Sequence, residues 1–346
     1  MRRASLWIFL ILSIPLAVNP FSRWRFEPDK AALLLLLAGL LAGGGLRLPR
    51  RAVALPLALY TALAALATLG SAAPAVSLWG APGWRVGLLT WLACTLLFLA
   101  ANAQFRNEAA RRRALDALLI GSAPVCALGV AQAAGLDPLA ALAGDGPRIT
   151  ATFGHPNFFA AYLAMVAPLT LGRAVAAETG GARRGWGALL AAQIACMVMT
   201  LSRSGWLAMA ASLGMAALVT VWRAGRRRLV GGMLAGAAGS GALLLGLSAL
   251  PALSGDAPPL LQTLTSVFRA GSPTVQVRLL GWEAAARMIA DRPALGFGPG
   301  TFGLALSAYY PPRLALFGGV RALGGPPHNL PRDLAAAGGA PRAAAH

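Results

Sequence analysis

The chain has 346 residues, of which 57% are hydrophobic and only 12% are charged, and its mean hydropathy is +0.65. Soluble domains are excluded, because they carry about twice that share of charged residues. The net charge is +19, but the basic residues lie in short clusters between apolar segments, whereas a nucleic-acid-binding surface gathers them on one domain. We therefore expect an all-α integral membrane protein that does not bind nucleic acid, since a polypeptide in lipid must satisfy its backbone polar groups internally.

Nine apolar segments follow one another along the chain. Each is predicted to be a transmembrane helix, because about 20 apolar residues cross the hydrocarbon core. The first is interpreted as a helix and not as a secretory signal, since no small-x-small cleavage site precedes Arg23. Cys94, Cys126 and Cys196 lie inside these segments and form no disulfide or metal-binding pattern. The predicted spans are residues 4–22, 31–46, 52–71, 86–105, 117–136, 156–172, 185–202, 204–222 and 229–250.

The distribution of basic residues predicts the orientation of these spans. With the N-terminus in the cytoplasm and the loops alternating, the cytoplasmic side holds sixteen basic residues and the four short outer loops hold six. This difference satisfies the positive-inside rule. We therefore expect the N-terminus in the cytoplasm and the polar motifs described below on the extracytoplasmic side.

A long segment, residues 251–330, follows the ninth span on the outer side and contains no membrane-length apolar run. Its length makes it a candidate functional loop. Within it, residues 276–291 are predicted to form a helix, with Val277, Leu280, Ala284 and Met288 on one stripe and Arg278 and Trp282 on another. The glycine-rich residues 296–300 predict a tight turn after this helix, and residues 331–346 are expected to be an atypical, disordered tail.

Four polar motifs are predicted on the outer side of the membrane. Several guanidinium groups and a histidine at one interface favour a site for a lipid-linked phosphate or diphosphate, because guanidinium forks match phosphate oxygens and a histidine can accept a proton from a hydroxyl. The outer carboxylates form no cluster with ligand spacing, so no catalytic metal site is expected. The motifs are the segment 148–157 with Arg148, His155 and Asn157, the segment 200–205 with Arg203, the pair Arg278 and Trp282, and the pair His328 and Asn329.

Structural interpretations of these residues stand beside the functional one. His155 and Asn157 lie where a helix would begin, with Pro156 at its first position, and such residues cap helices. Arg203 could extend its charged end to the lipid headgroups, although the tight connection around it favours a functional role.

The motifs Arg148-Ile-Thr-Ala-Thr-Phe-Gly-His-Pro-Asn157, Leu201-Ser-Arg-Ser-Gly205, Arg278-x3-Trp282, Asp291-Arg-Pro-Ala-Leu-Gly-Phe-Gly-Pro-Gly-Thr-Phe302 and His328-Asn329 occur in this order. Together they resemble the O-antigen ligase and polymerase superfamily of bacterial membrane proteins, over roughly residues 145–330. The resemblance implies a GT-C-like fold and a metal-independent glycosyltransferase without a cofactor. Such a ligase moves a glycan from undecaprenyl diphosphate to a sugar hydroxyl of the lipid A core, at the outer face of the inner membrane.

The same resemblance implies roles for individual residues. Arg203 and Arg278 match family arginines that engage the donor diphosphate, and His328 matches the family histidine proposed as the general base. Residues that share these motifs are expected to bind substrate: Arg148, His155, Asn157, Trp282 and Asn329.

Family members continue into further helices after the His-Asn motif, so this chain is expected to be truncated at its C-terminus. We divide it into N-terminal transmembrane helices (1–145), an O-antigen-ligase-like domain (146–330) and the tail (331–346). A polysaccharide polymerase and a protein O-oligosaccharyltransferase are close alternatives that differ in their acceptor. A small-solute transporter and an inactive remnant are alternatives of another class. Transporters usually place ionisable residues near the membrane midplane, whereas the candidates here lie at helix ends and in the outer loop.

Overall fold

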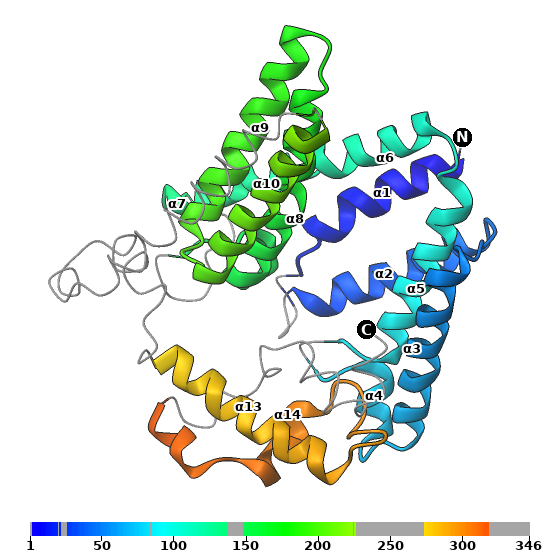
Figure 1. Cartoon of the computed structure of the whole chain (residues 1–346), viewed down its shortest axis with the longest axis vertical. Coiled ribbons are helices and arrows are strands. Elements are labelled where there is room, and N and C mark those ends of the chain that lie inside the picture. Colours follow the sequence, from blue (N-terminus) through cyan, green and yellow to red (C-terminus); the bar gives the residue numbers. More distant parts are fainter. Residues whose placement is uncertain are drawn as a thin grey trace, which may run out of the picture. The chain divides into compact units, whose positions relative to one another are not determined.

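The computed structural model describes residues 2–19, 21, 26–82, 85–136, 148–223, 225 and 273–317 of the chain. All regular secondary structure in these ranges is helical (Figure 1). The all-α prediction is therefore confirmed for this part of the chain. The predicted span 229–250, the predicted site residues His328 and Asn329, and the segment 331–346 lie outside the described residues.

The chain divides into two compact units. The first unit comprises Met1–Leu10, Ser22–Arg112 and Ala270–His346. The second comprises Ile11–Phe21 and Arg113–Arg269.

The first unit contains three apolar helices together with helices of the long outer segment. Helix α5 packs against α2, α3 and α4, and α13 packs against η3 and η4. The helices are α2 (Glu27–Ala42), α3 (Arg51–Leu69), α4 (Pro74–Trp79), α5 (Leu88–Gln104), α13 (Pro273–Asp291), α14 (Phe302–Ala305), η3 (Leu306–Tyr309) and η4 (Pro312–Phe317).

The second unit is a bundle in which α8 packs against both α9 and α10, and α7 packs against α9 (Figure 1). Two further helices, α1 and α6, contribute residues to both units. The helices are α1 (Arg2–Leu16), α6 (Glu108–Ile120), α7 (Ser122–Ala133), η1 (Ala151–Phe153), α8 (Pro156–Val175), α9 (Gly180–Met199) and α10 (Arg203–Arg223).

Several of these helices are long and apolar enough to cross a membrane, and they coincide with the third, fifth, sixth and eighth predicted spans. Two shorter apolar helices, Trp7–Leu16 and Leu88–Gln104, coincide with the first and fourth spans. Helices α2 and α9 occupy the second and seventh. The total of nine spans remains a prediction. The four helices of sufficient length are Arg51–Leu69, Glu108–Ala133, Pro156–Val175 and Arg203–Arg223.

The fifth predicted span differs from expectation at its start, because the helix begins at Glu108 and not at residue 117. The Asn107 side chain accepts a hydrogen bond from the backbone N–H of Ala110 at 2.7 Å, which is a helix-capping contact. Arg111 and Arg112 both contact the Glu108 carboxylate, at 2.8 and 3.2 Å. These polar contacts extend the helix beyond its apolar part.

The same span is interrupted at Gly121, between α6 and α7. Pro124 explains the interruption, because it has no N–H to donate to the carbonyl of Ile120 and its ring crowds that carbonyl. The Ser122 hydroxyl donates to the carbonyl of Leu119 at 2.6 Å and accepts from the Gln193 amide at 2.8 Å. The interruption is therefore bonded to α9 inside the bundle.

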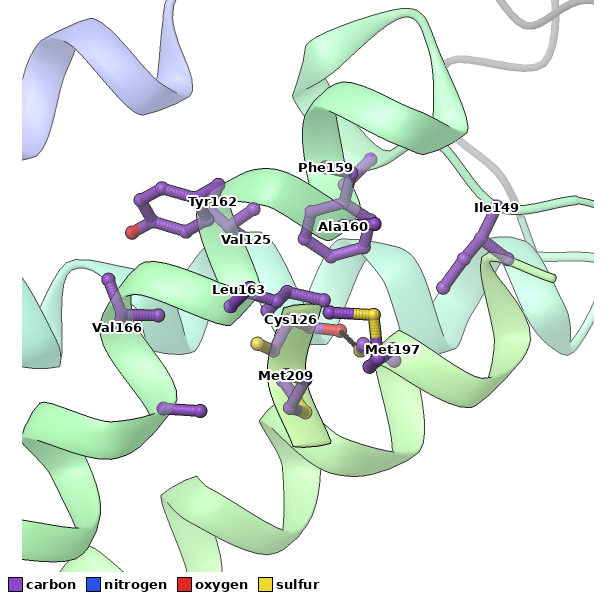
Figure 2. Packing of buried hydrophobic residues seen from close by; sticks show 14 of the residues in the cluster. Val125, Cys126, Ile149, Phe159, Ala160, Tyr162, Leu163, Val166, Met197 and Met209 are labelled. Atoms are coloured by element: carbon purple, nitrogen blue, oxygen red, sulfur yellow. Dashed lines mark hydrogen bonds between the residues drawn. The ribbon is translucent and has the colours of Figure 1, made fainter. Parts of the chain in front are cut away.

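The core of the second unit gathers side chains from α7, α8, α9 and α10 (Figure 2). Phe159 and Leu163 of α8 are fully buried there, beside Cys196 of α9. Lipid tails are as apolar as these side chains, so close van der Waals packing holds such helices together. The Cβ atom of an alanine at Gly205 would lie 2.5 Å from Ala160 Cβ, so α8 and α10 approach each other closely at this glycine.

The described part of the long outer segment has a small core of its own. Helix α13 was expected at residues 276–291 and spans Pro273–Asp291, so the prediction is confirmed with a start three residues earlier. Its predicted stripe contributes the fully buried Ala284 and Met288. The chain folds back over this face, and the core consists of Ala284, Ala285, Met288, Phe297, Phe302 and Leu306.

Candidate anion-binding site

The connection between α9 and α10 positions Arg203. It consists of three residues, and Leu201 adopts a positive φ of 49° within it. Ser202 caps α10, since its hydroxyl accepts from the N–H of Gly205 at 3.2 Å and its carbonyl accepts from the N–H of Trp206 at 2.9 Å. Arg203 is thus the first residue of α10 and is half-buried.

Arg148, which is distant in the sequence, is hydrogen-bonded to this connection between α9 and α10. Its Nε donates to the carbonyl of Thr200 at 2.9 Å, and its Nη2 donates to Asn157 Oδ1 at 3.3 Å. Partial burial and the positive charge of Arg203 lower the pKa of Arg148. The two guanidinium groups therefore lie close enough to repel each other.

The segment that follows Arg148 is bonded to the ends of several helices. The side-chain oxygen of Gln132, on α7, accepts from the backbone N–H groups of Thr150 and Ala151 at 3.1 and 2.7 Å. The Thr152 hydroxyl donates to the carbonyl of Pro15, on α1, at 2.5 Å. These bonds hold the segment in place, although Ala151 has an unfavourable positive φ of 46°.

Helix α8 begins at the same place. His155 caps it, because its Nδ1 accepts from the N–H of Asn157 at 3.1 Å, and Pro156 is the first helical residue. The structure thus confirms the helix-start interpretation of His155 and Pro156. A substrate-binding role for His155 remains a prediction.

Asn157 connects the two helix starts. Its Oδ1 accepts from the Ser202 hydroxyl at 2.8 Å as well as from Arg148. We call the group formed by Arg148, Asn157, Thr200, Ser202 and Arg203 the arginine corner. Helices α8 and α10 both begin at the arginine corner, and each N-terminus carries partial positive charge from the helix dipole.

The arginine corner is suited to bind an anion. Its two guanidinium groups and two helix N-termini all carry positive charge, and a guanidinium group presents five N–H donors in a planar fork that matches phosphate oxygens. In the described part of the second unit the carboxylates are those of Asp116 and Glu178. Asp116 is bound by Arg173 in a bidentate ion pair at 2.7 and 3.0 Å. A phosphate or diphosphate would relieve the repulsion between the two arginines.

The other predicted site residues lie in the first unit or outside the described ranges. Arg278 and Trp282 are half-buried residues of α13. His328 and Asn329 are among the residues that the structure does not describe. The convergence of Arg203, Arg278 and His328 therefore remains a prediction.

The sequence did not indicate Gln132 as a contributor, and it included Thr200 in the second motif without a role of its own. A polar glutamine within an apolar span was the available signal, since such residues usually have a specific partner. Among the residues with described positions, no three His, Cys, Asp or Glu side chains come together as metal ligands.

The apolar helices are features of an integral membrane protein. A comparison with family models finds that residues 188–345 match the O-antigen ligase family. The match confirms the resemblance predicted from the motifs, and it includes Arg203, Arg278 and His328. Arg148, His155 and Asn157 precede the matched residues. No curated protein and no solved structure matches the chain.

Proposed function

We propose that the protein is a glycosyltransferase of the O-antigen ligase type, which transfers a glycan from undecaprenyl diphosphate to a sugar hydroxyl. The family match supports O-antigen ligase or related polymerase activity in general. The observation that carries the proposal furthest is the arginine corner, where Arg148 and Arg203 meet at two helix N-termini. A diphosphate is the part of the donor that such a site would recognise.

In this proposal, Arg203 and Arg278 bind the donor diphosphate, and Arg148 supports Arg203. As the anomeric C–O bond breaks, negative charge develops on the departing undecaprenyl diphosphate. Guanidinium groups held in place beforehand stabilise that charge without reorganising. The donor is already activated by its diphosphate, so the reaction requires no nucleotide outside the cytoplasm.

His328 is proposed as the general base. It accepts the proton of the acceptor hydroxyl while the hydroxyl oxygen forms a bond to the anomeric carbon, and the configuration there is inverted. Correct placement of such a base contributes typically 10²- to 10⁴-fold to a rate. Trp282 and Asn329 are proposed to bind the sugars.

The acceptor distinguishes a ligase from its close relatives. A ligase uses a sugar of the lipid A core, a polymerase uses another lipid-linked glycan, and a protein O-oligosaccharyltransferase uses a Ser or Thr hydroxyl. We propose the lipid A core or a related glycan, at the outer face of the inner membrane. Incubating one donor with each of the three acceptor classes would identify the acceptor.

Alanine substitution of Arg203, Arg278 and His328 tests the catalytic proposal. Removing a hydrogen bond to a charged group costs about 1.5–3 kcal/mol, so Arg203→Ala and Arg278→Ala should each lower kcat/KM about 10- to 100-fold. His328→Ala should lower kcat at least about 100-fold. The measurement is transfer from a purified lipid-linked donor by purified protein in detergent or nanodiscs.

Arg223→Ala is the matched control, because Arg223 is the last residue of the same helix that Arg203 begins. It removes one charge from the opposite end of α10 and should leave transfer unchanged. Arg203→Lys should retain only part of the activity, since lysine keeps the charge but loses the forked geometry. Normal transfer by all three alanine variants would refute the catalytic proposal, and solute flux without glycan transfer would favour a transporter.

A further inference from the structure

The glycine-rich turn of the long outer segment is bonded to the corner between α3 and α4 within the first unit. The turn was predicted at residues 296–300, and the structure confirms it with positive φ angles of 62°, 102° and 71° at Gly296, Gly298 and Gly300. The Ser71 hydroxyl donates to the carbonyl of Phe297 at 2.9 Å. These two residues are 226 positions apart in the chain.

Two serines form the binding surface for this turn. The oxygen atoms of Ser71 and Ser77 are 2.7 Å apart, and Ser71 Oγ also accepts from the N–H of Ala73 at 3.0 Å. A hydroxyl has one hydrogen and two lone pairs. Since Ser71 gives its hydrogen to Phe297, Ser77 must be the donor in the serine pair, and the bonding capacity of Ser71 is then fully used.

On the side of the turn, Thr301 provides a further hydroxyl for the backbone carbonyls. Thr301 is buried, and its hydroxyl contacts the carbonyls of Phe297 and Gly298 at 2.9 and 2.7 Å. The single hydroxyl hydrogen of Thr301 is shared between these two carbonyls, whereas Ser71 gives its hydrogen to Phe297. If one of these groups were removed, its buried partner would be left without a hydrogen bond. The resulting loss of free energy would exceed the net contribution of the hydrogen bond itself.

Only glycine fits at position 298. A Cβ atom there would lie 2.3 Å from Ser77 Oγ and 2.4 Å from Ser71 Oγ, and φ is in the region that favours glycine. Gly300 is also close to the chain, since its Cβ would lie 3.3 Å from the carbonyl oxygen of Val86. The backbone of the turn thus lies directly against the two serine side chains of the corner between α3 and α4.

The turn is also joined to α13, which carries Arg278. Phe297 belongs to the same small core as Ala284, Ala285 and Met288 of α13. The Arg292 guanidinium lies over the Phe297 ring, 4.8 Å from its centre. A displacement of Phe297 would therefore move the C-terminal part of α13.

We propose that Ser71 and Ser77 are positioning residues, which hold the turn at 296–301 and, through Phe297, set the position of α13 and of Arg278 for the donor diphosphate. This inference rests on the proposed function. The two serines act at a distance from the substrate, so their loss should weaken donor binding while the chemistry of bound substrate continues.

A labelling experiment tests the contact between turn and serines independently of activity. In a full-length variant without the three native cysteines, Ser77→Cys should react slowly with a maleimide, since Ser77 is fully buried. Adding Gly298→Ala should displace the turn and accelerate labelling at least about tenfold, and Ser307→Cys, which is exposed, should label rapidly with or without Gly298→Ala. Rapid labelling of Ser77→Cys alone, or no acceleration by Gly298→Ala, would overturn the contact.

A kinetic experiment tests the positioning role. Ser71→Ala should raise the KM for the lipid-linked donor about five- to tenfold with kcat changed less than twofold, and Ser71→Thr, which keeps the hydroxyl, should restore most of the affinity. Ser307→Ala is the control, because its hydroxyl bonds only locally, to the carbonyl of Leu304. A wild-type KM in Ser71→Ala and in Ser71→Ala/Ser77→Ala, measured beside an active wild type, would overturn the proposal.

The two proposals fail in different ways. If the unsubstituted protein transferred no glycan with any donor and acceptor class, the proposed function would be refuted, and the role of the serines in donor binding would be refuted with it. The labelling experiment would still show whether the turn contacts the serines. An active wild type combined with unaffected serine variants would refute only the positioning role.

Discussion

Asn157 connects Arg148 to the start of α10 in the arginine corner, because its single side-chain oxygen accepts from Arg148 Nη2 and from the Ser202 hydroxyl. An amide is neutral, so it orients both groups without reducing the positive charge around them. A carboxylate at the same place would accept the same hydrogen bonds and would also neutralise part of that charge. For the proposed anion binding, the neutrality of residue 157 therefore matters more than its shape.

Asn157→Asp is expected to raise the Kd for the diphosphate donor about tenfold or more, a change of about 1.4 kcal/mol. The protein should remain folded, because both hydrogen bonds persist and an ion pair to Arg148 is added. The measurement is donor binding by calorimetry, together with thermal unfolding in detergent.

Asn107→Asp is the matched control for this change. Asn107 caps α6, and aspartate caps helices about as well as asparagine. Unchanged donor affinity in Asn157→Asp would show that the arginine corner does not bind the donor.

At the scale of elements, α8 and α10 depend on one glycine. A Cβ atom at Gly205 would lie 2.5 Å from Ala160 Cβ and 3.1 Å from Met197 Sδ. Small residues let membrane helices approach closely, and their contacts are van der Waals contacts that fall off steeply with distance. Arg203 is two residues away, so any separation of these helices would also disturb the arginine corner.

Gly205→Ala should destabilise the protein by about 1–3 kcal/mol, the usual cost of overpacking a well-packed core. Gly214→Ala in the same helix is the control, since no atom lies within 4 Å of a Cβ there and alanine favours helix by up to about 1 kcal/mol. The measurement is the unfolding midpoint in detergent.

Adding Ala160→Gly to Gly205→Ala should recover part of the loss, because it removes the atom that clashes. Equal stability of the Gly205→Ala and Gly214→Ala variants would contradict the close approach of α8 and α10.

At the scale of the whole molecule, the contacts inside each unit join helix ends that the loop alternation predicts on the same side. In the first unit, Trp7 Nε1 donates to Gln104 Oε1 at 2.9 Å, and both residues were expected near the cytoplasm. In the second unit, the Asp116–Arg173 pair joins two predicted cytoplasmic ends, while Arg148 and Arg203 share a predicted outer end. The alternation of loops is thus consistent with every one of these contacts.

Cysteine labelling should confirm this topology. In the cysteine-free background, a membrane-impermeant maleimide should label cysteines at Ser204 and Ser307 in intact cells whose outer membrane has been permeabilised. A cysteine at Ala182 should label only after the inner membrane is opened. All three positions are exposed in the structure. Labelling of Ser204 and Ser307 from opposite sides would refute the proposed location of the site.

The sequence alone was sufficient to predict the described helices and the resemblance to the family, whereas their sidedness stays a prediction. Hydrophobic length is a local property, and it located the described apolar helices to within a few residues at most ends. The cap at His155, the helix predicted at 276–291 and the turn at 296–300 were also predictable, because they depend on neighbours in the chain. The early start of the fifth span at Glu108 was not, since polar residues extend a helix beyond its apolar part.

The tertiary structure decided which distant polar groups meet. Arg148 reaches Thr200 across 52 positions, and Ser71 reaches Phe297 across 226. Helices that are apolar on all sides have no preferred face in their sequence, so periodicity does not specify their neighbours. Only close packing of the helices, at contacts such as Gly205 against Ala160, brings these donors and acceptors together.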